Sequence, residues 1–354
     1  MNHMKKILFP FVLLLLIVSC KSQSNSNILE NPKTFSSLSI DTLFKDEISI
    51  RAIAIAGNKV WYAGSKSKYG YYDLEKKQNN LKTISKENLE FRSLAQNDSS
   101  LFLLNVGSPA FLYKIDKHNL SNKVVYQEDL EKVFYDSMQF WNDKEGIAMG
   151  DPIDTCLSVI ITRDGGDSWK KISCENLPTV VSAEAAFAAS NTNIVVKENN
   201  TWIVTGGKEA NVIFSSDKGK SWKKYSTPII QGEAMTGIFT ADFYDTNQGF
   251  ISGGNYEKLT QNYGNKAHTV DGGKTWDLIA ENEGFGYASC VQYIPNSGGK
   301  GLVTVGASGI YYSNDAGKKW KQLSTNANLY TIRFIDENTA IAAGKNCMLQ
   351  LRFL

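Results

Sequence analysis

Polar and apolar positions alternate over short runs along most of the chain, and polar turns separate these runs. Alternation with a period of two residues predicts β-strands, and helical periodicity is nearly absent. Seven segments share one order, which is a strand, a polar turn, a second strand and, in most copies, a glycine. They begin at Arg51, Arg92, Asp136, Glu184, Phe239, Ser289 and Tyr330. The pattern therefore predicts an all-β protein built from a repeated unit.

A shorter motif, [ST]-x-D-x-G-x-[STK]-W, occurs four times between strand-like runs. Its copies are TRDGGDSW, SSDKGKSW, TVDGGKTW and SNDAGKKW, with the conserved pairs Asp164 and Trp169, Asp217 and Trp222, Asp271 and Trp276, and Asp315 and Trp320. Asp and Ser or Thr side chains can bond the amides of a turn, Gly supplies a positive φ, and Trp packs the turn onto a sheet. Each copy is predicted to close a hairpin. A calcium loop would need several carboxylates within about 12 residues, whereas each copy guarantees one.

The aspartates of the motif are 53, 54 and 44 residues apart. Periods of this length are typical of propeller blades. Seven segment starts predict a seven-bladed β-propeller over residues 36–354, with four-stranded antiparallel blades. The last start leaves room for three strands only, so the run SSLSIDTLF from Ser36 is predicted to supply the fourth strand and close the ring. A two-sheet all-β domain is the alternative.

The N-terminus differs from the rest of the chain. Lys5 and Lys6 precede an apolar run over residues 7–18, and the sequence IVSC ends at Cys20. The run is shorter than the roughly 20 residues of a membrane-spanning helix, so residues 1–19 are interpreted as a cleaved signal peptide. The alternative is an ordinary secretory signal with a chance cysteine. The Ser/Asn-rich residues 20–35 are interpreted as a lipidated cysteine followed by a flexible tether.

The segment before Cys20 resembles the lipobox of bacterial lipoproteins, in which the cysteine is acylated. Lys21, rather than Asp, follows the cysteine, which in that family favours the outer membrane of a Gram-negative envelope. The resemblance implies an exported lipoprotein, held in the membrane through Cys20 and facing the periplasm.

Charge and short motifs exclude several classes of function. Without Lys5 and Lys6, 38 − 2 = 36 basic residues balance 36 acidic ones, so there is no basic field for nucleic acid or for anionic lipid. The sequence has no Cys/His zinc spacing and no glycine-rich nucleotide motif. We expect no metal, no cofactor and a monomeric chain.

Four cysteines follow Cys20. Cys156 and Cys174 are equally far from residue 165, at the centre of the first motif turn, so they are predicted to face each other on paired strands. An exported protein can form a disulfide there, and the sequence leaves open whether it does. Cys290 and Cys347 are interpreted as small buried apolar residues.

Alignment of the seven first strands predicts a polar ring at one mouth of the channel. It consists of the seven segment starts, from Arg51 to Tyr330, and the following loops add Asp151, Lys208, Glu209, Asn255, Tyr256 and Ser308. Arg51 would lie beside Arg92, and two adjacent guanidinium groups favour an anion between them. They are predicted to bind a ligand carboxylate or an acidic segment of a partner. Alternatively, Asp136 and Glu184 neutralise them internally.

The four-copy motif resembles the Asp-box, or BNR repeat, of sialidase-like propellers. That resemblance raises the possibility of a glycoside hydrolase with Asp136, Asp151 or Glu184 as its carboxyl groups. The arginine triad of sialidases has no full counterpart, because the chain has five arginines and Arg333 has the wrong strand parity to join Arg51 and Arg92.

The order of the segments FYDSMQFWNDKEGIAMGDP, EAAFAAS, WIVTGG, GIFTADFYDTNQGFISGG and LVTVGASGIYYSNDAGKKW resembles a bacterial family of exported propellers related to the photosystem II stability and assembly factor. Members of this family are often labelled oxidoreductases or glycosyl hydrolases, but no cofactor motif here supports the redox label. The resemblance implies a scaffold that holds a protein, or a saccharide, at the polar face, and no chemistry of its own.

Overall fold

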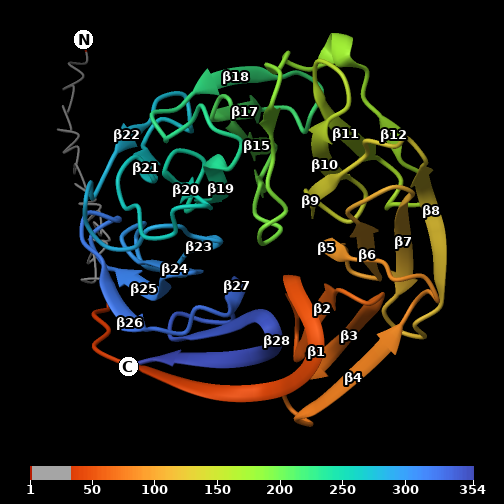
Figure 1. The fold of residues 1–354 in the computed structure, drawn as a ribbon, viewed down its shortest axis with the longest axis horizontal. Helices are drawn as coiled ribbons and strands as arrows, with labels where there is room; N and C mark the ends of the chain where they lie inside the picture. Colours follow the sequence, from red (N-terminus) through yellow and green to blue (C-terminus); the bar gives the residue numbers. More distant parts are fainter. Residues whose placement is uncertain (2–32) are drawn as a thin grey trace. The chain divides into compact units, whose positions relative to one another are not determined.

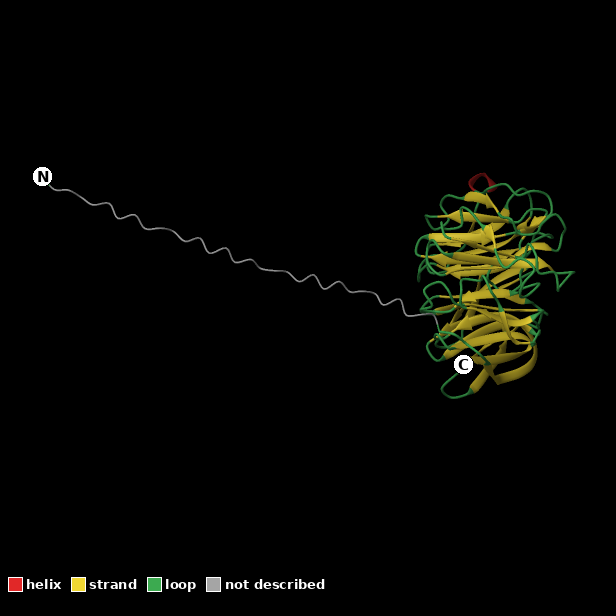
Figure 2. Cartoon of the chain, turned by 90° about the vertical axis from the view of Figure 1, so that its left-hand side faces the viewer, coloured by secondary structure: helices red, strands yellow, loops and turns green. Residues whose placement is uncertain are grey.

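The computed structural model describes Met1 and residues 33–354, and from Lys33 onwards the strands form a ring of antiparallel sheets (Figure 1). The expected signal peptide, Cys20 and the tether up to residue 32 lie outside the described residues. Seen from the side, strands dominate, and one 3-10 turn, η1 (Cys174–Asn176), is the helical element of the described part (Figure 2). No helix in the described part is long and apolar enough to cross a membrane.

The strands of residues 33–354 form six sheets, each of which contains a four-stranded antiparallel blade. The first blade consists of β1 (Leu38–Ala56), β2 (Lys59–Gly64), β3 (Lys68–Asp73) and β4 (Gln78–Thr83), and the second of β5 (Phe91–Gln96), β6 (Ser100–Asn105), β7 (Ala110–Asp116) and β8 (Asn122–Glu128). The third consists of β9 (Tyr135–Phe140), β10 (Gly146–Pro152), β11 (Leu157–Thr162) and β12 (Lys170–Lys171), and the fourth of β14 (Ile194–Lys197), β15 (Asn200–Val204), β17 (Asn211–Ser215) and β18 (Lys223–Ser226). The fifth consists of β19 (Thr236–Phe243), β20 (Gly249–Asn255), β21 (Lys266–Thr269) and β22 (Asp277–Leu278), and the sixth of β23 (Cys290–Tyr293), β24 (Leu302–Gly306), β25 (Gly309–Ser313) and β26 (Lys321–Ser324).

Two sheets carry two further strands. The first is extended by β27 (Leu329–Phe334) and β28 (Thr339–Phe353), and the fifth by β13 (Glu184–Ala185) and β16 (Gly206–Gly207). The prediction of seven separate blades was therefore wrong, because the described strands form six blades. The physical reason is the length of β1, which bonds β28 through its first half and β2 through its second half. The seventh segment thus joins the first sheet instead of forming one of its own.

Apolar side chains fill the spaces between neighbouring sheets. Between the first and second sheets, for example, Ala52 and Trp61 pack with Leu94 and Leu103, all of them nearly inaccessible to solvent. Both faces of most strands are covered in this way, which explains why their burial does not follow a simple alternation. The core is therefore a series of clusters distributed around the ring.

The two ends of the described chain meet in the first sheet. Leu38 to Lys45 of β1 pair with Cys347 to Phe353 of β28. Just before β1, the Phe35 ring lies 5.4 Å from the Phe353 ring and 5.1 Å from the Tyr312 ring, measured between centroids. Lys33 forms an ion pair with Glu337 at 2.8 Å. The closure of the ring therefore depends on residues at both ends of the sequence.

The four motif copies form turns with a shared hydrogen-bond pattern. In the first, Asp164 Oδ1 accepts from Thr162 Oγ1 at 2.8 Å and from the Ser168 amide at 3.0 Å, and the Ser168 hydroxyl donates to Oδ2 at 2.6 Å. Partial burial alone would raise the pKa of Asp164, but these hydrogen bonds lower it to about 2. The carboxylate of such a turn thus stabilises the backbone of the turn to which it belongs.

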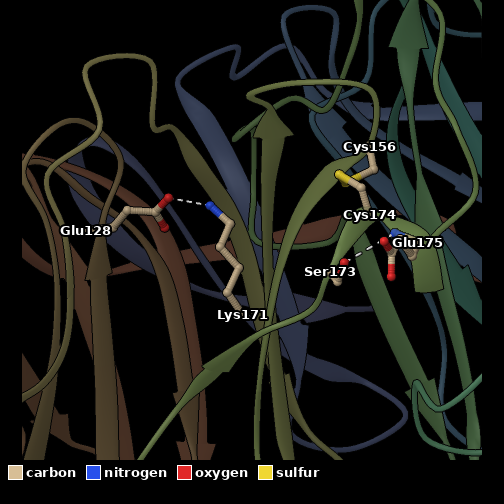
Figure 3. Close-up of a disulfide and its surroundings, with 6 residues drawn as sticks. All are labelled: Glu128, Cys156, Lys171, Ser173, Cys174 and Glu175. Atoms are coloured by element: carbon tan, nitrogen blue, oxygen red, sulfur yellow. Dashed lines mark hydrogen bonds and ion pairs between the residues drawn. A yellow bond between two sulfur atoms is a disulfide. The ribbon is translucent and has the colours of Figure 1, made fainter.

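A disulfide joins Cys156 and Cys174, whose Cα atoms are 5.5 Å apart (Figure 3). It links the residue before β11 to η1 and encloses the first motif turn, so the two cysteines lie just outside the paired strands on which the sequence placed them. Beside it, Lys171 donates to the Glu128 carboxylate, which also accepts from the Tyr135 hydroxyl at 2.7 Å. The ion pair connects β12 to β8 in the neighbouring sheet. This sector of the ring is therefore held both covalently and by a partly buried ion pair.

Candidate functional site

A short polar segment crosses the centre of the ring. Residues 187–193, which we call the channel segment, appear in Figure 1 as the yellow-green loop that reaches the middle of the molecule. Its polar groups form hydrogen bonds with strands of several surrounding blades. The contacts are Arg51 Nη1 to Ala189 O, Asn191 Nδ2 to Leu94 O, the Met138 amide to Asn191 Oδ1, the Ala241 amide to Thr192 O, Ser190 Oγ to Ser289 O, and Thr331 Oγ1 to Ser190 O. The segment divides the channel into two mouths.

The channel segment also changes the alignment of the fourth repeat. The sequence predicted an inner strand starting at Glu184, but β13 contains only Glu184 and Ala185 and pairs with β16. The innermost strand of that blade is β14, which starts at Ile194. Asn191 lies between them with φ 59°, a left-handed conformation that interrupts strand geometry. Glu184 is therefore not equivalent to Arg51 and Arg92.

Arg51 and Arg92 lie at one mouth of the channel. We call these two residues, together with Tyr287 and Tyr330, the arginine mouth. The guanidinium carbon of Arg51 lies 4.1 Å from the centroid of the Tyr330 ring, and Nη1 donates to Ala189 O at 3.1 Å. Its Nε is buried and has no partner within the described residues. Burial, followed by the charge of Arg92, lowers the pKa of Arg51. The mouth therefore holds positive charge that is only partly compensated.

Arg92 has one carboxylate partner. Its Nε donates to Glu90 Oε1 at 2.7 Å, and both side chains are partly exposed, so the pair is worth little energetically. Arg92 keeps the rest of its guanidinium donors for other partners. One glutamate thus faces two arginines at this mouth, which leaves room for an external anion.

Aromatic side chains lie beside the arginines. Phe239 stacks on Phe187 with ring centroids 3.9 Å apart, and Tyr287 meets its other side edge-on at 4.8 Å. Tyr256 packs against Tyr287 at 5.1 Å, and 46% of its surface is exposed. Burial raises the pKa of Tyr287 to about 12, although a hydrogen bond from Ser289 and the charge of Arg51 oppose the rise. An exposed aromatic edge therefore adjoins the cationic groups.

Two carboxyl groups, those of Asp136 and Asp151, lie near the arginines. Asp136 is completely buried, and neither of its oxygens has a hydrogen-bond partner in the described part of the chain. Burial raises the pKa of Asp136 well above its usual value, the neighbouring Asp151 raises it further, and Arg92 opposes the rise. Burial also raises the pKa of Asp151, whose Oδ1 accepts from the Ala186 amide at 2.8 Å. Within the described residues neither carboxyl group forms an ion pair with Arg51 or Arg92, although Asp136 interacts with the charge of Arg92.

Replacement of Asp136 by Asn is expected to stabilise the protein at neutral pH. A raised folded pKa means that ionisation is penalised in the folded state, so stability is lost as the pH rises from about 4 through that pKa. The D136N variant removes this loss, so at pH 7 we expect it to be more stable than wild type. Chemical denaturation at pH 5 and pH 8 measures it. D98N, the same change at an exposed carboxylate, is the control, and equal pH dependence in wild type and D136N would contradict the assignment.

Glu184 belongs to a separate set of polar groups. Its Oε1 accepts from Thr205 Oγ1 at 2.7 Å and from Asn211 Nδ2 at 2.9 Å, and it is only 2% exposed. The Asn211 amide also donates to Glu209 at 3.1 Å, and Lys224 lies 3.5 Å from Glu209. These contacts satisfy the Glu184 carboxylate internally. Glu184 therefore supports the local fold and does not present an open acid or base.

The other predicted residues are spread around the same face. Asn255 donates to Glu233 at 3.2 Å, Ser289 donates to the Tyr287 hydroxyl at 3.2 Å, and Ser308 accepts from the Gly286 amide at 3.4 Å. Lys208 is exposed. In residues 33–354 no group of three or more His, Cys, Asp or Glu side chains is placed to hold a metal ion. Cys290 and Cys347 are free thiols, the first of them buried.

Sequence reasoning missed the opposite mouth. Arg333 was set aside because of its strand parity, yet it lines three adjoining cavities at the far end of the channel. A signal was available, since an arginine between the apolar residues of the strand YTIRF must reach either solvent or a polar cavity. Lys197, which follows the apolar residues of β14, gives a similar signal.

No known family model matches the sequence, and no curated protein sequence matches it. Solved structures share the fold. A structure of YCF48 bound to D1 peptide has a TM-score of 0.61 and 12% identity, over 91% of this chain and 98% of that one. The structure of the RRP9 WD40 repeats has a TM-score of 0.65 and 9% sequence identity, over 91% of this chain and 100% of that one. The structure of a GH74 xyloglucanase from Xanthomonas campestris has a TM-score of 0.65 and 11% sequence identity, over 90% of this chain and 54% of that one. The fold is thus a β-propeller.

Proposed function

We propose that this chain is a binding scaffold that holds a carboxylate-bearing or acidic segment of a protein at the arginine mouth. The observation that carries the proposal is the imbalance of charge there. Arg51 lies against Tyr330 with an unpartnered buried Nε, Arg92 stands near it, and among the described residues a single partly exposed glutamate forms an ion pair with either of them. An incoming carboxylate would satisfy these donors with charge-assisted hydrogen bonds.

The aromatic neighbours suit the same partner. Phe239, Tyr256 and Tyr287 form an aromatic cluster beside the arginines, in which Phe239 and Tyr287 are buried and Tyr256 is accessible. Aromatic and arginine side chains are the residues that most often dominate protein interfaces. YCF48, a propeller of similar fold, has been solved with a D1 peptide, and the sequence resembles the assembly-factor family. Both facts support a peptide partner in preference to a saccharide.

The glycoside-hydrolase alternative is less favoured. Such enzymes need two carboxyl groups that flank an open substrate site. Asp136 is fully buried below the mouth and Glu184 is occupied by Thr205 and Asn211. Asp151 alone does not make a catalytic pair. The Asp-box assignment for the four turns remains part of the proposal, and it concerns the fold more than any chemistry.

Binding should depend on the two arginines. The mature protein, tagged at its C-terminus, is used to capture partners from solubilised envelope, and each captured protein is then tested as synthetic peptides in a fluorescence titration. R51Q/R92Q should lose at least tenfold in affinity, since hydrogen bonds to charged groups contribute about 1.5 to 3 kcal/mol. K170Q/K223Q, which removes the same charge from exposed outer strands, should bind as wild type does.

The outcomes separate clearly if thermal melts show that both double variants fold. Equal retention by wild type and R51Q/R92Q would place the partner elsewhere and contradict the proposal. A partner whose affinity is insensitive to salt would also contradict it, because an arginine-carboxylate interface of this kind weakens as ionic strength rises. No retained protein at all would leave the scaffold without a partner and count against it.

We further propose that the chain is an exported lipoprotein, anchored through Cys20 in the outer membrane and facing the periplasm. The charged start, the apolar run and the position of Cys20 support it. Expressed in a Gram-negative host, wild type should fractionate with membranes, and C20S should appear in the soluble fraction or retain its signal segment. A C347S variant is the control. Membrane association of C20S with a cleaved signal would rule out the lipid anchor.

A further inference from the structure

The mouth opposite Arg51 contains a hollow that the proposed function does not use. The inner strands run from the arginine mouth to this end, where β1, β5, β9 and β27 finish at Ala56, Gln96, Phe140 and Phe334. Three adjoining cavities of about 540, 270 and 150 Å³ open here, and Arg333 lines all of them. We call the set Lys197, Asp242, Gln292 and Arg333 the second mouth. The largest cavity has the size of small-molecule sites, which range from about 300 to 1,000 Å³.

Arg333 is held rigidly by the protein. Its Nη1 donates to Ile332 O at 2.7 Å and to Thr331 Oγ1 at 3.1 Å, and Nη2 approaches Ser190 O at 3.4 Å. All three partners are neutral oxygens. Within residues 33–354 no carboxylate lies within 4.0 Å of either Arg333 or Lys197. The guanidinium is thus fixed in position, and its positive charge has no direct counterion.

Asp242 supplies the carboxylate that lines the same hollow, and both of its oxygens already accept hydrogen bonds. Its Oδ1 accepts from its neighbour's amide, that of Phe243, at 2.9 Å, and Oδ2 accepts from the Tyr293 amide at 2.7 Å. Burial raises the pKa of Asp242, and the charges of Lys197 and Arg333 oppose the rise. Two cations therefore share a hollow with at most one negative charge, and that charge is tied to the backbone. One further anion would balance the set.

The walls of the hollow specify more than a charge. Tyr293 and Phe334 supply aromatic surface, and the ring of Tyr244 lies 5.7 Å from that of Tyr293. Gln139 and Gln292 line the inner part with amide groups that can bond hydroxyl or carbonyl oxygens. A ligand with an anionic end and a ring-shaped body fits this arrangement. A bare inorganic ion would leave the aromatic wall unused.

We propose that the second mouth is a binding site for a small carboxylate with a ring attached, with the carboxylate between Arg333 and Lys197 and the ring against Tyr293 and Phe334. An aromatic acid and a sugar acid share this chemistry, and the test distinguishes them. The site is separated from the arginine mouth by the channel segment. It would therefore act independently of the peptide partner proposed above.

The test measures ligand binding by calorimetry with the mature protein, using benzoate and glucuronate as probes and benzyl alcohol and glucose as uncharged counterparts. At least one carboxylate should bind, and its uncharged counterpart should not. K197Q should weaken that binding by about tenfold, because one charged contact is lost. The side chain of Lys197 makes no hydrogen bond or ion pair within residues 33–354, so this variant should fold. R333Q should weaken binding at least as much.

The opposite mouth provides the matched control. R51Q/R92Q removes two positive charges from the other end of the channel and should leave carboxylate binding unchanged. No binding of either carboxylate at about 10 mM, a concentration that reveals even weak sites, would overturn the proposal. So would binding that persists in K197Q and R333Q, or binding that disappears in R51Q/R92Q. Preference for benzoate would identify an aromatic acid, and preference for glucuronate a sugar acid.

Discussion

A chain that lacks residues 347–354 is expected not to fold cooperatively. This segment is the second half of β28, and its pairing with β1 closes the ring. Its buried apolar side chains are Met348, Leu349, Leu351 and Phe353. Each contributes about 1.5 to 3 kcal/mol on burial, so the set amounts to about 6 to 12 kcal/mol as an upper bound. That is comparable to the roughly 5 to 15 kcal/mol by which a whole domain is stable.

Point variants in the same strand test the reasoning without a large deletion. Leu351 is completely buried, whereas Arg352, the next residue, is exposed. L351A should lower the free energy of unfolding by about 3 kcal/mol, as is usual for a buried leucine, and R352A by less than about 0.5 kcal/mol. Urea denaturation, followed by tryptophan fluorescence, measures both. A truncated chain that unfolds at the same urea concentration as wild type would show that the closure is dispensable.

Replacement of Asn191 by Ala is expected to cost about 3 to 7 kcal/mol. Asn191 lies in the channel segment and is 1% exposed. Its Oδ1 accepts from the Met138 amide at 3.0 Å and its Nδ2 donates to Leu94 O at 2.7 Å. Alanine would leave both backbone groups buried without partners, at about 1 to 3 kcal/mol each. It would also have to adopt φ 59°, which Asn tolerates better than Ala.

A second substitution at the same position separates the two effects. Glycine adopts a positive φ freely, so N191G should lose the hydrogen bonds but not suffer the conformational strain. We expect N191G to be more stable than N191A by about 1 kcal/mol and less stable than wild type by several. Thermal and urea unfolding of the three proteins gives the values. If N191A is as stable as wild type, the channel segment does not hold the inner strands together.

The sequence contained most of the local structure. Alternating polarity indicated strands, and the Asp-Gly-Trp motif indicated hairpin turns, because both depend on residues close together in the chain. The number of blades could not be obtained in the same way. It depends on whether a strand such as β1 ends between two partners or continues from one to the other, and no local signal around Ser49 records this.

The candidate site was partly accessible to the same reasoning. Alignment of the first strands associated Arg51, Arg92 and Tyr330, and their binding role remains a prediction. It also included Glu184, because the run EAAFAA has the apolar composition of a strand, although only Glu184 and Ala185 pair as one before the chain enters the channel segment. Arg333 was missed because its environment is a cavity formed by several blades, which strand parity alone does not describe.

The channel segment joins two consecutive peptide carbonyls to opposite ends of the molecule. Ala189 O accepts from Arg51, and Ser190 O accepts from Arg333 and Thr331. Both arginines therefore rest on the same short stretch of backbone, one from each end of the channel. The crossing loop is thus a common support for the two faces as well as a barrier between them.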